Sequence, residues 1–214
     1  MTTPPDDADN PLRALLLCPR FTGEQWQLPV DEAFGDRVLI GWRTARPRVD
    51  AGVPSSVARL LAQALCRHST VTFAKGHHAP AGASLVPRQW RMGRHFEWSS
   101  TRDPDEAAAG MFGDPLFPWE RQGQLALLSP PGDIPVLDER HLALTHDPSM
   151  ASTLRGVSVC GVLLPGVDGD VAGLYAFGAP DSEVYQSELV TCARERAVTA
   201  EVLDEPGFAR SLAG

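Results

Sequence analysis

The chain has 214 residues and a formal net charge of −8, with 43% hydrophobic and 21% charged residues. This composition is typical of a folded globular protein and excludes a wholly disordered chain. The acidic balance disfavours general binding to nucleic acid or to anionic membranes. No run of residues approaches the ~20 apolar residues of a membrane span, and the acidic, proline-containing start differs from a signal peptide. We therefore expect a cytoplasmic protein without a membrane partner.

Residue usage and charge are both uneven along the chain. There is one lysine, Lys75, against 18 arginines, a bias that indicates a GC-rich bacterial coding sequence and weakens each arginine as evidence for a site. Residues 1–103 carry a net charge of +3, whereas residues 104–214 carry −11. The acidic half would attract a basic partner protein.

In chain order, residues 1–10 are expected to form a flexible tail and residues 11–214 one globular domain, which could divide into two lobes near 100–120. Apolar residues at helical spacing predict two main amphipathic helices, 55–67 and 182–203, covering one face of a sheet. Apolar runs predict strands at 13–18, 37–42, 69–74, 124–128, 157–164 and 171–177. Strands and helices alternate irregularly, which favours an α+β fold with a mixed, mostly antiparallel sheet.

The last two strands form the clearest local motif. The segment 156–178 reads as a β-hairpin, because two apolar runs flank a stretch dense in turn-forming residues. Asp168 and Asp170 belong to that turn rather than to a calcium loop, since the further ligands of an EF-hand do not follow. The segment 75–87 is rich in glycine, alanine and proline and reads as a loop. Asp103 followed by Pro104 predicts the start of a short helix.

Basic and aromatic residues form one candidate binding site. Arginine pairs with phosphate or carboxylate, and histidine titrates near neutrality, so a cluster of both could bind a small anion in an enzyme or sensor. The residues of this alternative are Arg43, Arg46, Arg91, Arg94, His77, His78 and His95. The same segments with Trp42 and Trp90 could hold single-stranded nucleic acid, a weaker alternative in an acidic protein.

Motifs of common enzyme classes are missing from the sequence. It has no Ser nucleophile elbow, no phosphate-binding glycine loop and no HExxH. The four cysteines lie inside apolar segments without CxxC spacing, which is typical of buried thiols. The sequence thus predicts neither a metal nor a cofactor and leaves enzymatic activity open, with the balance against it.

The leading hypothesis is a non-enzymatic protein-binding module, such as an inhibitor, an immunity-type antidote to a basic toxin, or an accessory subunit. The acidic C-terminal half supports it, because complementary charge speeds association with a basic protein. The segment 112–119 adds aromatic residues of the kind that dominate interfaces. Phe112, Phe117 and Trp119 either close the core or contact a partner.

Overall fold

In the computed structural model, residues 11–19, 37–45, 55–78, 94–113, 126–138, 141, 154, 156–165, 173–178 and 182–213 are described. For 37, 75–78, 94–96, 113, 164–165, 173–178 and 213 the description covers the backbone alone. The expected tail at 1–10 and the turn at 168–170 lie outside these residues.

The described strands form a single eight-stranded sheet with the order β4-β3-β5-β6-β7-β2-β1-β8. Every neighbouring pair is antiparallel except β1 with β8, so the predicted α+β class with a mostly antiparallel sheet is confirmed. The strands are β1 (Leu12–Pro19), β2 (Arg37–Thr44), β3 (Thr70–His78), β4 (Arg94–Thr101), β5 (Ala126–Ser129), β6 (Gly161–Pro165), β7 (Gly173–Gly178) and β8 (Thr199–Val202). The helices are α2 (Ser55–His68), α4 (Pro104–Ala108) followed by the π-helical turn η3 (Ala109–Gly113), α5 (Ser182–Glu195) and α6 (Glu205–Ala213).

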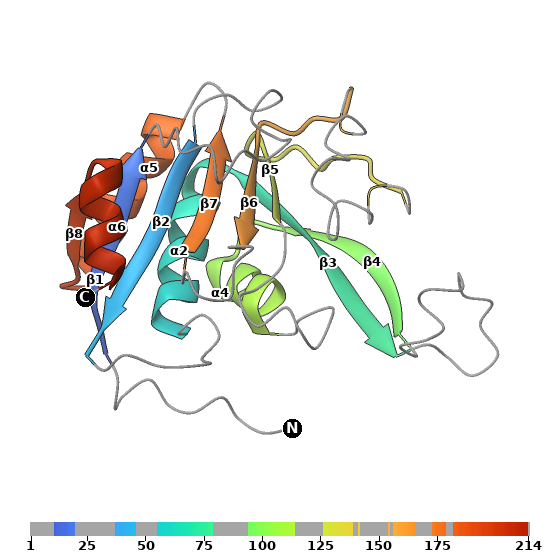
Figure 1. Ribbon diagram of the computed structural model, residues 1–214. Coiled ribbons are helices and arrows are strands. Elements are labelled where there is room, and N and C mark those ends of the chain that lie inside the picture. The colour runs from blue at the N-terminus through green and yellow to red at the C-terminus, as the bar shows by residue number, and fades with distance from the viewer. Residues whose placement is uncertain are drawn as a thin grey trace.

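Helices cover both faces of the sheet (Figure 1). Helices α2, α4 and α5 lie on one face, and α6 lies on the other beside β1 and β2. The sequence of β1 requires this arrangement, because all five residues from Ala14 to Cys18 are buried. Since side chains alternate across a strand, Leu15 and Leu17 pack with α2 and α5, whereas Leu16 packs with α6.

The first face holds the larger part of the core. Helix α2 buries eight residues there, and Tyr185 and Leu189 of α5 pack beside them. The hydroxyl group of Tyr185 shares a buried hydrogen bond with Ser69, at the junction of α2 and β3. This bond satisfies two polar groups that would each cost about 1–3 kcal/mol if buried without a partner.

The C-terminal segment differs from the sequence-based prediction. The helix expected over 182–203 ends at Glu195, and Ala197 adopts a left-handed backbone conformation with φ of 56°. Residues 199–202 then add to the sheet as β8, because parallel pairing with β1 outweighs the local preference for helix. Pro206 and Gly207, which the sequence predicts to end the long helix, lie instead in the first turn of α6. Asp204 caps α6 by accepting a hydrogen bond from the Gly207 amide at 2.8 Å.

The hairpin of β3 and β4 also differs from expectation. Residues 75–78 belong to β3 rather than to a loop, and β4 was not predicted from sequence. Both follow from cross-strand pairing over a continuous register from Val71↔Thr101 to His78↔Arg94.

The other hairpin is confirmed, since β6 pairs antiparallel with β7, although its first strand begins at Gly161 rather than 157. The predicted helix start at Asp103 is confirmed too, because its side chain accepts from two amides of α4.

Close packing between η3 and the sheet generates a test of the core. A methyl group added at Gly110 would lie 2.0 Å from Cε2 of the buried Phe73. We expect Gly110→Ala to destabilise the protein by about 1–3 kcal/mol, because overpacking outweighs the ~1 kcal/mol gained in helix propensity. Urea denaturation followed by circular dichroism measures the change.

Two further variants separate overpacking from other causes. Ala109→Ser changes the exposed neighbour and should shift stability by less than ~0.5 kcal/mol. Phe73→Leu should offset part of the Gly110→Ala loss, because the smaller side chain leaves room for the methyl group. Wild-type stability in Gly110→Ala would contradict this packing.

Candidate partner-binding surface

The second face of the sheet changes character from one end to the other. Around β1 and β2 it is apolar, with Leu16, Leu39 and Phe208 buried together. Across β3 and β5 it carries the buried hydroxyl side chains of Thr70 and Thr72 beside Ser129, which pairs with Thr70 in register. The Thr72 hydroxyl bonds that of Ser100 in β4, so the segment that covers this end of the face must supply a polar partner for Thr70.

Residues 130–138, which we call the strap, supply this partner directly after β5. At its beginning, the amide of Gly132 donates to Oγ1 of Thr70 at 3.0 Å. Gly132 has φ of +91°, a conformation that glycine adopts without strain, so the strap can turn here. At its end, the carbonyl group of Asp138 accepts from the Trp98 indole at 3.2 Å. The Asp138 amide donates to Nδ1 of the buried His141 at 3.0 Å.

Between these anchors the strap places apolar side chains on both of its sides. Pro135 is buried, and Leu137 packs on the buried apolar residues of the second face of the sheet. The alternate residues Ile134 and Val136 are 70% and 89% exposed. Single exposed apolar residues are common, but here two exposed β-branched residues lie two positions apart on one anchored segment.

Carboxylate groups border the exposed pair. Asp133 precedes Ile134 and accepts from the Ser158 hydroxyl at 2.9 Å, which ties the strap to the segment before β6. Asp138 follows at the other end, where its carboxylate lies 2.9 Å from Nδ1 of His141. The outward surface of the strap is therefore apolar at its centre and acidic at both ends.

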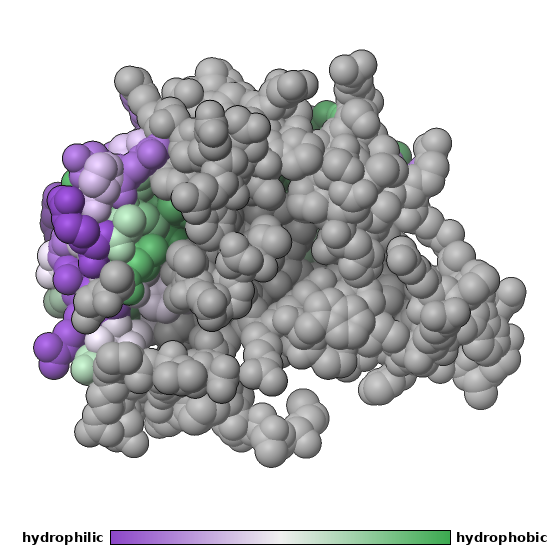
Figure 2. Space-filling model, in the orientation of Figure 1, coloured by the Kyte–Doolittle hydropathy of each residue, from purple (hydrophilic) through white to green (hydrophobic). Residues whose placement is uncertain are grey.

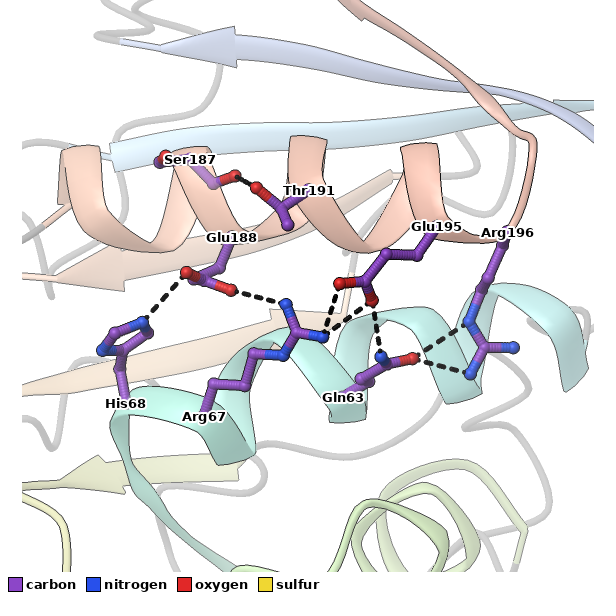
Figure 3. A network of polar contacts seen from close by, with 8 residues as sticks. All are labelled: Gln63, Arg67, His68, Ser187, Glu188, Thr191, Glu195 and Arg196. Carbon is purple, nitrogen blue, oxygen red and sulfur yellow. Dashed lines mark hydrogen bonds and ion pairs between the residues drawn. The ribbon is translucent and has the colours of Figure 1, made fainter.

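A polar network joins α2 to α5 away from the strap (Figure 3). Arg67 lies between two acidic residues of α5, 3.0 Å from Glu188 and 2.7 Å from Glu195. His68 contacts Glu188 at 3.1 Å, and Gln63 joins Glu195 to Arg196. These contacts make the charged sides of the two helices complementary.

The network explains part of the uneven charge along the sequence. Arg67 and His68 belong to the basic N-terminal part, whereas their partners on α5 belong to the acidic C-terminal part. Arg43 of β2 likewise pairs with Glu201 of β8. Figure 2 shows a mostly hydrophilic surface at the end of the molecule where α6 and β8 lie. Carboxylates of α5 and β8 are thus used within the fold, which makes the strap the stronger candidate for outside contacts.

The arginine and histidine residues singled out from sequence are not all brought together. Arg43 lies in β2 and Arg94 in β4, with four strands between them, or about 24 Å at the usual strand spacing. His77 and His78 of β3 do lie in register with His95 and Arg94 of β4. Two other members of the set lie outside the described residues: Arg46 and Arg91.

Of the aromatic residues proposed for partner binding, the structure describes Phe112. It lies in η3 and is half-buried against the residues that α2 and α5 bury on the first face of the sheet. Phe117 and Trp119 lie outside the described residues.

Sequence reasoning missed the strap, because Pro130–Asp133 read as the end of a strand. The signal that could have indicated it is the short apolar run from Ile134 to Leu137 between Asp133 and Asp138.

The buried cysteines are poor nucleophiles. Burial raises the pKa of Cys66 to about 12 and that of Cys18 to about 11. Burial also raises the pKa of Cys192. Because the thiolate is the reactive form, these three thiols are inert near neutral pH.

Comparison with known proteins gives no relative from which a function could be transferred. No family model matches the chain, and no curated protein or solved structure shows significant similarity to it. Among the side chains that the structure describes, no three His, Cys, Asp or Glu residues converge as metal ligands would. None of the described helices combines the length and apolar character needed to cross a membrane.

The α2–α5 network should make stability depend on pH in the acid range. The hydrogen bond from Arg67 lowers the pKa of Glu188 below its ordinary value. A carboxylate with a lowered folded-state pKa stabilises the protein above its unfolded value of ~4.3 and loses that effect as the pH falls. We expect wild type to be more stable than Glu188→Gln at pH ~7, and the difference to shrink as the pH falls through ~4.3 toward the lowered pKa of Glu188 in the folded state.

Urea denaturation at a series of pH values measures this difference. Glu183→Gln serves as the control, since it removes a carboxylate from the exposed start of the same helix, outside the network. A stability difference between wild type and Glu188→Gln that stays constant from neutral to acid pH would show that charge pairing is not its cause.

Proposed function

We propose that this chain is a non-enzymatic protein-binding module of the bacterial cytoplasm, with a basic partner protein that docks on the strap. The observation that carries the proposal is the pair Ile134 and Val136, which are 70% and 89% exposed on a segment anchored on both sides. An inhibitor, an immunity-type antidote or an accessory subunit would use such a surface.

Anchoring matters because binding costs conformational entropy. A flexible loop must be ordered when it binds, whereas a segment already held by hydrogen bonds loses little freedom. The contacts of Gly132, Asp133 and Asp138 hold the strap before any partner arrives. Burying the two exposed side chains would then contribute on the order of 3 kcal/mol, or about two orders of magnitude in Kd.

Charge supplies the second part of the recognition. Asp133 and Asp138 border the apolar pair, and the whole chain carries −8. A partner that presents apolar side chains between Lys or Arg residues would match this pattern. Attraction of this kind raises the association rate and weakens as salt screens it.

Quantitative affinity capture from cells of the source organism tests the proposal. We expect a basic protein to be retained by wild type at ~0.05 M salt and less so at ~0.5 M. The double variant Ile134→Ser/Val136→Ser should retain much less of it, and purified components should then show a Kd raised by about 100-fold. Both substitutions are on the surface and should change stability by less than ~0.5 kcal/mol each.

The matched control is Val202→Ser, which removes an exposed valine from the edge strand β8. It should retain the partner as wild type does. The proposal fails if no partner is captured at either salt concentration, or if the strap and β8 variants behave alike.

A further inference from the structure

The described sheet ends at β8, its outermost strand beside β1 (Figure 1). None of the described strands pairs with the outer side of β8. An edge of this kind presents backbone amide and carbonyl groups with which another strand can pair. Proline and lysine often protect such edges, and residues 199–202 contain neither. Four strands separate β8 from β5, so this edge is distinct from the strap that follows β5.

Hydrogen bonds to β1 decide which backbone groups of β8 face outward. Directly after β8, the Leu203 amide donates to the Leu17 carbonyl group at 2.8 Å. Successive residues of a strand direct their amides to opposite sides, and the parallel register with β1 runs without a shift. The amide of Glu201 therefore faces β1 as well, whereas the amide and carbonyl groups of Ala200 and Val202 face the outer edge.

Apolar side chains accompany these outward backbone groups. Val202 is 51% exposed, and Val198 and Ala200 are half-buried against the residues that α2 and α5 bury. The three residues are spaced by two, so they form one row on the α5 side of the sheet. The charged residue of β8, Glu201, lies on the other side and pairs with Arg43 of β2. A strand added to this edge would cover the apolar row.

We propose that the edge of β8 binds β8 of a second copy of this chain, antiparallel and about a two-fold axis at Ala200. A two-fold interface uses the same surface of both copies, so each contact occurs twice. Ala200 then lies opposite its own copy, and their outward amide and carbonyl groups bond to each other. On either side of the axis, Val198 lies opposite Val202 of the second copy. The row that is exposed in one chain thus becomes a buried row of valine and alanine.

Charge favours this register over its neighbours. An axis at Glu201 would place two carboxylates directly opposite each other, which is unfavourable in a strand pair. An axis at Val202 would place Ala200 opposite Asp204. With the axis at Ala200, the turn that contains Arg196 lies beside Asp204 of the second copy, so opposite charges approach at both ends of the interface.

Sedimentation equilibrium of the full chain at concentrations up to ~100 µM tests for the dimer. We expect a species of twice the chain mass of 23.1 kDa that dissociates on dilution. Val202→Asp should raise the Kd of the dimer by about 10-fold or more, because it places a carboxylate in the valine pair. Ala200→Pro should raise it too, since proline removes an outward amide and leaves the bonds to β1. Circular dichroism confirms that both variants are folded.

The matched control is Val184→Asp, the same change at a valine of α5 that is 39% exposed. Val184 lies one turn before Glu188, on the side of α5 that faces α2 rather than the edge of the sheet. This variant should dimerise as wild type does. A wild-type chain that stays monomeric at the highest concentration, or an equal loss in Val184→Asp and Val202→Asp, would overturn the proposal.

Disulfide formation tests the register. An axis at Ala200 places the two copies of this residue about 5.5 Å apart between Cα atoms, within the range that a disulfide bond spans. Ala200→Cys should therefore give a covalent dimer under mild oxidation. Wild type and Val202→Cys should not, because the two copies of Val202 lie four residues, or ~13 Å, apart along the strands. A covalent dimer from Val202→Cys but not from Ala200→Cys would contradict the register.

Discussion

The structure depends on the burial of β1 from both sides. Residues 14–18 form an uninterrupted buried run, and a strand of that kind cannot lie on a sheet with a solvated face. Helices α2 and α5 exclude water from one side. On the other side α6 lies so close that a Cβ atom at Gly41 would be 2.9 Å from the Leu212 side chain. The need for cover on both faces therefore explains both α6 and the strap.

The strap solves the same problem at the other end of the second face, where the sheet carries hydroxyl groups. Because Thr70 needs a partner when buried, the covering segment is held by hydrogen bonds as well as by apolar contact. A segment with one side held against the sheet must direct its alternate residues outward. Exposure of Ile134 and Val136 is thus a geometric consequence of how the face is covered.

Sequence reasoning succeeded where the signal is local. The run at Leu15 predicts a buried strand, and the spacing of apolar residues from Val57 predicts α2. It missed β4 and β8, because strands such as Thr199–Val202 are defined by the neighbour they pair with rather than by their own residues. It could not find the candidate site either. Exposure of Val136 depends on burial of its neighbour Pro135, a tertiary property that composition does not carry.

We propose that the strap is a preformed surface rather than a loop that orders on binding. Native-state hydrogen exchange tests it most directly, at the amides of Gly132, Asp133 and Asp138 that donate within the fold. If the strap is preformed, these amides in the free protein exchange far more slowly than those of an unstructured chain, as the amides of the neighbouring strand β5 do. Exchange at unstructured rates while β5 stays protected would contradict it.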